Sequence, residues 1–312
     1  MDGGAGQDSG QGSEGPGDRS FGGYLLASAR SIIADARQSI TDEKLTDAEA
    51  VHDVRKALKR WRALMRLLSG PLKDQAERMR VEGRDLMRRL AGARDAQAGL
   101  DALEDLRKIA LAADPPLSAT SLNSIQKRLT DQRDAAEQSS FTAQMRESLD
   151  KYLDFAALSV ERWPLPAIDF ETVADGLTVT YRRAQKLMPD DWAAAAPDDL
   201  HDLRRRVVEH RHQMDLIEPL WPRLGKLWAE EAQRLRTRLG SCQDLAMLQA
   251  FTAPHQPLAP WRSRLAPLIA ARRLEHLESA ERLADRLFAE KPKAFRRRIA
   301  ALWKARPTRQ AD

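Results

Sequence analysis

The chain has 312 residues, a formal net charge of +5 and a single cysteine, Cys242. A lone cysteine excludes an internal disulfide, and no apolar run approaches the roughly 20 residues that span a bilayer, so we expect a cytoplasmic protein without membrane contact. Residues 1–20 are rich in Gly and carry a charge of −3, which leaves +8 for the remainder. We expect this segment to be a disordered acidic tail.

Helical periodicity runs from about Phe21 to the C-terminus, and no run of alternating β-branched residues indicates a strand, so the sequence predicts an all-α fold. "SGPL" at Ser69–Leu72 predicts the end of one long helix, and "ADPPLSATS" at Ala113–Ser121 breaks another. "WPLPAIDF" at Trp163–Phe170 is typical of a connector. Pro197, followed by two aspartates, predicts a helix start, because acidic residues favour the positive end of the helix dipole.

Two pairs of segments suggest an internal repeat. "VHDVRKALKRWRALMRLL" (51–68) aligns with "LHDLRRRVVEHRHQMDLI" (200–217) at an offset of 149 residues, so that His52 matches His201. "RRLAGARDAQAGL" (88–100) aligns with "TRLGSCQDLAMLQ" (237–249) at the same offset and pairs Asp95 with Asp244. Two motifs with one offset indicate a duplication. We therefore expect repeat one at about 21–160, a connector at 161–170 and repeat two at about 171–312, each with about four helices.

The first repeated segment predicts an amphipathic helix. At roughly 100° per residue, an arc of roughly 80° collects five basic or protonatable side chains: His52, Arg55, Lys59, Arg62 and Arg66, with Lys56 on one flank. Apolar residues cover the opposite side, and no acidic residue lies one turn away within the cationic stripe. Because like charges one turn apart repel, the stripe is either a solvated face or a surface for something negative.

The second copy repeats this face more weakly. His201, Arg204 and Arg211 share a side, and Arg205 and His212 flank it. Val208, Glu209 and Asp215 stand where the first copy has Lys59, Arg60 and Arg66. Other basic residues add candidates for the same surface, namely Arg88, Arg94, Arg182 and Arg183.

These residues resemble a known family. "HDVRKALKRWR" with a downstream "RD", repeated as "HDLRRRVVEHR" with "QD", is similar to the CHAD domain, the conserved histidine α-helical domain. Further likeness, as in "FGGYLLASARSIIAD" and "DGLTVTYRRAQKLMPDD", extends over residues 21 to about 304, so residues 21–312 are expected to form this domain. The resemblance implies two four-helix bundles related by a pseudo-two-fold axis around a basic channel.

The resemblance also implies binding of inorganic polyphosphate through the duplicated basic face, and association with polyphosphate granules. Some family members carry an N-terminal triphosphatase domain with a tandem Glu-x-Glu-x-Lys signature, which does not appear here. The expectation is therefore binding without catalysis, with no cofactor and no metal.

Two other functions compete with this interpretation. Arg-rich helices also suit a nucleic-acid binder, but Trp61 and Trp221 stand in apolar contexts that predict core positions rather than stacking platforms. An enzyme or metal site based on His52 and Asp53 is disfavoured, because adjacent helical residues point about 100° apart. Cys242 is predicted to be a packing residue. The oligomeric state is not indicated by the sequence.

Overall fold

The computed structural model of the protein describes residues 21–90, 94–113, 117–137 and 141–306. Within these ranges the regular structure is entirely helical, which confirms the predicted all-α class. The predicted tail at 1–20 lies outside the described residues. Over the described part of the chain, no helix is both long enough and apolar enough to cross a bilayer.

The helices follow one another along the chain with short connections. The α-helices are α1 (Phe21–Thr41), α2 (Asp47–Leu67), α3 (Ser69–Arg89), α4 (Arg94–Ala112), α5 (Ala119–Glu137), α6 (Ala143–Arg162), α7 (Phe170–Lys186), α8 (Pro197–Ile217), α9 (Pro222–Phe251), α10 (Arg262–Leu287) and α11 (Pro292–Lys304). Short 3₁₀ helices lie at Leu165–Ala167, Glu218–Leu220 and Ala259–Trp261.

The predicted count of about four helices per half is wrong for the described residues, where six α-helices precede the connector and five follow it. Threonine caps mark two of the helix starts, those of α2 and α6. The Thr46 hydroxyl accepts a hydrogen bond from the Glu49 amide, and Thr142 accepts one from Met145. Such hydroxyls satisfy amides that a helix start leaves without partners, so each threonine begins a new helix.

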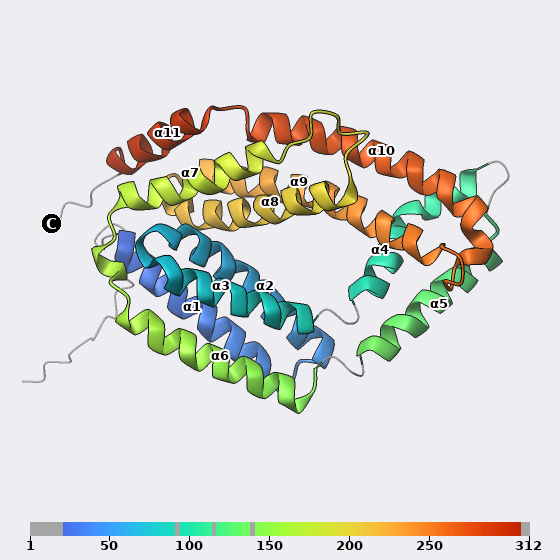
Figure 1. Cartoon of the computed structure of the whole chain (residues 1–312), viewed down its shortest axis with the longest axis horizontal. Coiled ribbons are helices and arrows are strands. Elements are labelled where there is room, and N and C mark those ends of the chain that lie inside the picture. Colours follow the sequence, from blue (N-terminus) through green and yellow to red (C-terminus); the bar gives the residue numbers. More distant parts are fainter. Residues whose placement is uncertain (1–20, 91–93, 114–116, 138–140, 307–312) are drawn as a thin grey trace, which may run out of the picture.

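The apolar side chains form two clusters, and these do not coincide with the two predicted repeats. The larger cluster joins α1, α2, α3 and α6 to α7, α8, α9, α10 and α11. The smaller one joins α4 and α5 to the C-terminal end of α9 and the start of α10. In Figure 1, α4 and α5 lie to one side, beside the ends of α9 and α10. The pseudo-two-fold relation of the two halves stays a prediction.

Helix α2 lies at the centre of the larger cluster and packs against α1, α3, α7 and α8. Its apolar face is almost completely buried, with Trp61 2% exposed and Leu64 and Met65 fully buried. Gly176 of α7 lies against the backbone of α2, where an added Cβ would come within 2.5 Å of the Leu67 carbonyl oxygen. Close packing on this side leaves the cationic face of α2 directed toward α8 and the space beside it.

Candidate functional site

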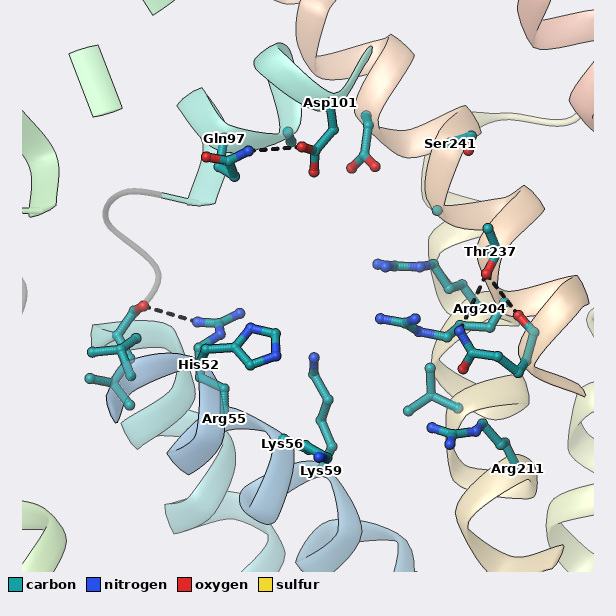
Figure 2. Close-up of a pocket in the computed structure, with 18 of the residues that line it drawn as sticks. His52, Arg55, Lys56, Lys59, Gln97, Asp101, Arg204, Arg211, Thr237 and Ser241 are labelled. Carbon is teal, nitrogen blue, oxygen red and sulfur yellow. Dashed lines mark hydrogen bonds between the residues drawn. The ribbon is translucent and has the colours of Figure 1, made fainter. Parts of the chain in front are cut away.

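A cavity of about 850 Å³ lies where α2, α4, α8 and α9 meet. Figure 2 shows His52, Arg55, Lys56 and Lys59 of α2 on one side and Arg204 and Arg211 of α8 on the other. Among the described residues, six Lys and Arg side chains line this space, namely Arg55, Lys56, Lys59, Arg204, Arg211 and Arg236. Three aspartates also line it, Asp47, Asp101 and Asp244, so the lining carries a formal charge of +3.

The α2 wall is fixed by its cap and by α3. Thr46 and Glu49 form a reciprocal capping box that begins α2 just before the basic residues. Arg55 Nη1 donates to the carbonyl oxygens of Met87 and Leu90, at 3.1 and 3.0 Å, where α3 ends. Because a carbonyl oxygen has no formal charge, these bonds orient the guanidinium without cancelling its charge.

The α8 wall is held against α9 in a similar way. Arg204 Nη1 donates to the Gln243 side-chain oxygen at 2.8 Å, and Gly240 leaves room for this guanidinium. A Cβ at Gly240 would lie 3.3 Å from Arg204 Nη2, so a larger residue there would press on the arginine. About two turns further along α8, Arg211 lies 4.0 Å from Asp215. The two arginines therefore reach the cavity from a surface formed jointly by α8 and α9.

The remaining side of the cavity is acidic and polar. Asp101 and Gln97 of α4 lie across from the cationic walls (Figure 2), and Asp101 accepts a hydrogen bond from Gln97 at 2.8 Å. On the α2 side, Asp47 at the start of the helix is paired with Arg146 of α6 at 2.5 Å. The cavity thus has a strongly basic side and a weakly acidic side, which suits a ligand held along the basic walls.

Helix α4 is held in this position by a buried polar contact with α10. The Asp105 carboxylate lies 2.7 Å from His276 Nε2 and accepts hydrogen bonds from both Nε and Nη2 of Arg272. Burial alone would raise the pKa of Asp105, but the hydrogen bonds from His276 and Arg272 outweigh it and keep the pKa well below its usual range. Asp105 therefore stays ionised at neutral pH and keeps α4 beside the cavity.

Several cavity residues were not selected from the sequence. Gln233, Thr237, Ser241 and Asp244 recur every three or four residues along α9 and form one polar stripe that faces the cavity, with Arg236 beside it. This helical spacing is visible in the sequence. The many charged residues on the other faces of α9, however, make this stripe hard to recognise in the sequence.

The downstream half of the α2 stripe does not line the cavity. Arg62 and Arg66 lie instead among α2, α3 and α8, near Arg80, Arg206 and Glu209. The Glu209 carboxylate is 3.7 Å from Arg66 Nε and 2.5 Å from Arg206 Nη1. No acidic residue of α2 lies within the stripe, but Glu209 of α8 supplies a counter-charge to its downstream half.

The structure thus distributes the predicted site residues over several places. Seven line the cavity: His52, Arg55, Lys56, Lys59, Arg204, Arg211 and His212. Arg62 and Arg66 lie around Glu209, and Arg205, within electrostatic reach of Arg62, pairs with Asp202 at 2.8 Å. The others do not line the cavity: Arg88 is exposed beside Asp85, Arg182 and Arg183 are exposed on α7, and His201 is half-buried. The side chain of Arg94 lies outside the described residues.

Two histidines of α8, His210 and His212, are buried. His210 is 1% exposed among Tyr181, Phe288 and Phe295, and burial lowers its pKa to about 4. His212 lies 3.3 Å from Asp215, and burial lowers its pKa despite the opposing effect of that carboxylate. Both rings are therefore neutral at pH 7. Over the described residues, no group of three or more His, Cys, Asp or Glu is placed to hold a metal ion.

Cys242 is 2% exposed, as predicted for a packing residue, and burial raises the pKa of its thiol to about 12. Only about one thiol in ten thousand is then a thiolate at pH 8, and the thiolate is the reactive form. We expect a disulfide reagent to label the native protein slowly and the urea-unfolded protein at once, measured by release of its chromophore. Rapid labelling of the native protein would contradict this burial.

One aromatic prediction is wrong. Trp61 is a core residue, but Trp221 is 51% exposed at the start of α9. Trp221 follows a 3₁₀ turn and precedes Pro222, so the chain changes direction there and leaves the ring outside the core. Trp221 does not line the cavity.

Comparisons with known proteins bear on the fold and the family. The profile of the CHAD domain matches residues 26–253. Among solved structures, the chain is similar to PptA from Streptomyces chartreusis, with a TM-score of 0.63 and 18% sequence identity. That similarity covers 87% of this chain and 100% of the PptA chain, and at this identity it supports the fold alone. No curated protein matches the chain.

Proposed function

This chain belongs to the CHAD domain family, and on that premise we propose that it binds inorganic polyphosphate in the cavity between α2 and α8. The observation that carries the proposal is the composition of the cavity walls. Basic side chains from α2, α8 and α9 converge on one space of about 850 Å³, although α2 is far from α8 and α9 in the sequence. Basic residues that serve only solubility would point to bulk water, because bringing two basic faces together costs electrostatic free energy.

The chemistry of polyphosphate suits these walls. The polymer carries negative charge on every repeat and has no base to read, so its recognition needs only a row of cations on a rigid surface. Helices hold Arg55, Lys59 and their neighbours at a spacing of roughly 5.4 Å per turn. Arg and Lys form charge-assisted hydrogen bonds to phosphate oxygens, and binding releases counterions from the polymer.

The proposal extends to the parts of the family resemblance that concern architecture and location. The two halves are proposed to be related by a pseudo-two-fold axis around a basic channel, of which this cavity is a part. Association with polyphosphate granules in the cytoplasm follows if the cavity holds the polymer. Binding without turnover is part of the same proposal, and an unchanged polymer length after long incubation, measured on a gel, is the result expected.

Competition binding tests the main proposal. We expect a labelled long-chain polyphosphate to be displaced by unlabelled polyphosphate at much lower phosphate concentration than by single-stranded RNA or ATP. If about six phosphates are contacted, the slope of log K against log salt should be near −4, taking about −0.7 per contact. Equal and weak displacement by all three competitors would contradict a dedicated site. Stronger displacement by RNA would favour a nucleic-acid binder instead.

A further inference from the structure

A second group of basic side chains lies beside the cavity, between α2, α3 and α8. We call Arg62, Arg66, Arg80 and Arg206 the inner arginine cluster. The Arg66 side chain is 10% exposed, Arg80 is 11% and Arg206 is 17%. The positive charges of Arg80 and Arg206 repel both Arg62 and Arg66.

Glu209 is the carboxylate at the centre of this cluster, and its side chain is 6% exposed. One oxygen accepts a hydrogen bond from Arg206 at 2.5 Å and lies 3.7 Å from Arg66 Nε. Attraction to the same carboxylate also acts on Arg62. Several guanidinium groups therefore surround the Glu209 carboxylate, as they would surround a bound phosphate group.

The cluster remains short of negative charge. Glu77, which pairs with Arg80, and Glu209 are its acidic partners, so four arginines and two glutamates leave a formal charge of +2. Burial lowers the pKa of Arg66 to about 10 despite the attraction of Glu209, and the neighbouring arginines add to the decrease. Among the residues that the structure describes, the buried Nε atoms of Arg62 and Arg66 find no hydrogen-bond acceptor. Buried donors without acceptors cost free energy, so a further anion would be stabilised here.

The cluster is continuous with the cavity wall. Met87 of α3 accepts a hydrogen bond from Arg55 through its carbonyl oxygen, and its sulfur lies 3.8 Å from Arg62 Nη1. Arg55 lines the cavity and Arg62 belongs to the cluster, so one residue of α3 touches both. Exposed Arg183 lies at the outer edge, within electrostatic reach of Arg66. A polyanion that leaves the cavity along α2 and α3 would meet the cluster next.

We propose that Glu209 is a built-in competitor that occupies a second anion subsite in the inner arginine cluster and so limits how much of a polyphosphate chain the protein holds. This inference rests on the proposed function. The alignment of the repeated segments agrees with it, because Glu209 stands where the first copy has Arg60. An acidic residue at this position neutralises the guanidinium groups that a phosphate would otherwise contact.

The variant Glu209→Gln tests the inference, because glutamine keeps the shape and an acceptor for Arg206 while removing the charge. We expect long-chain polyphosphate to bind about three- to tenfold more tightly, with a salt slope steeper by about 0.7, as one more phosphate contact requires. The matched control is Glu231→Gln on α9, which makes the same change in net charge at a residue that pairs with Arg234 of the same helix. Equal effects of the two substitutions would overturn the inference.

A melting experiment with tripolyphosphate separates the subsite from the cavity. Removing one partner from a buried ion pair leaves an uncompensated charge. Glu209→Gln should therefore melt at a lower temperature than the unaltered protein in chloride buffer and regain stability when millimolar tripolyphosphate is added at constant ionic strength. Were the variant unfolded in chloride, recovery of its helicity by tripolyphosphate would be the expected result, and no recovery would overturn the inference.

The failures of the two proposals are distinguishable. An unaltered protein that does not bind long-chain polyphosphate overturns the proposed function and, with it, the limit on chain length. The tripolyphosphate response of Glu209→Gln then still tests the anion subsite by itself. Conversely, tight binding by the unaltered protein together with a Glu209→Gln variant that behaves like Glu231→Gln overturns only the inference about Glu209.

Discussion

Replacing one basic residue on each wall of the cavity, in the double variant Lys59→Gln and Arg211→Gln, is expected to weaken polyphosphate binding about 100-fold. Each side chain is expected to supply a charge-assisted hydrogen bond, worth about 1.5–3 kcal/mol, and the lower end applies because both groups are partly exposed. Two such losses make a factor of about 100. Titration of the labelled polymer at fixed salt measures the change.

Lys59 and Arg211 are better choices than Arg55 and Arg204, although the latter two also line the cavity. Arg55 holds the end of α3 through two carbonyl oxygens, and Arg204 joins α8 to α9 through Gln243. Replacing either would disturb the packing of helices as well as the charge. A double variant at Arg55 and Arg204 would therefore confuse a loss of binding with a change in structure.

The control for this experiment is Arg282→Gln with Arg286→Gln, two exposed residues of α10 outside the cavity lining. It removes the same two positive charges from the molecule. If the cavity is the site, we expect a change of less than about threefold, because charges more than a Debye length of roughly 8–10 Å from the ligand are largely screened. Equal weakening by the two double variants would mean that bulk charge, and not the cavity, binds the polymer.

The largest loss of stability is expected for Trp61→Ala. Trp61 is 2% exposed on the apolar face of α2 and stacks on Trp163 of the connector, with 6.2 Å between ring centroids and 18° between the planes. Truncating a buried Trp to Ala typically costs about 3–5 kcal/mol, because transfer free energy is lost and a cavity remains. The free energy of unfolding of the helices that share the larger apolar cluster should fall by this amount. Urea denaturation followed by circular dichroism of the helical signal measures it.

A conservative and an exposed substitution make this test specific. Trp61→Phe should cost clearly less than Trp61→Ala, because most of the ring volume is kept. Leu158→Ala changes a side chain of α6 that is 59% exposed and should shift the free energy by less than about 0.5 kcal/mol. A Trp61→Ala variant as stable as Leu158→Ala would show that α2 is not anchored through its apolar face.

Local patterns were enough to predict the two helices, α2 and α8, that carry most of the basic residues of the site. The spacing of apolar and basic residues predicted α2, and its end at "SGPL" is confirmed by the last residue of the helix, Leu67. Pro197 with its two aspartates marks the start of α8, as predicted. The family followed from the order of the motifs and is supported by the match over residues 26–253. The two helix predictions depend on residues within a few turns of each other, where side-chain spacing directly expresses helix geometry.

The sequence of α2 alone could not predict that its cationic stripe is divided between the cavity lining and the inner arginine cluster. Ala63 lies within the stripe at roughly 20° from His52, yet it is fully buried, because α8 packs there and Gln213 donates to its carbonyl oxygen at 3.2 Å. Arg62 and Arg66, on either side of this contact, belong to the inner arginine cluster and do not line the cavity. A small residue among long basic ones permits such a close approach, but its partner is 150 residues away in the chain.

By itself, the sequence determined the helical class, the central amphipathic helices, the excess of positive charge on one face and the family. Only the tertiary structure decided which of those charges meet, since this depends on where α8 and α9 pack against α2 and on which acidic side chains they bring. Helix formation is encoded by neighbours along the chain, whereas the cavity and the position of Glu209 arise from contacts between distant segments. The electrostatic effect of a charge depends on distance in space and on burial, and neither is a property of sequence separation.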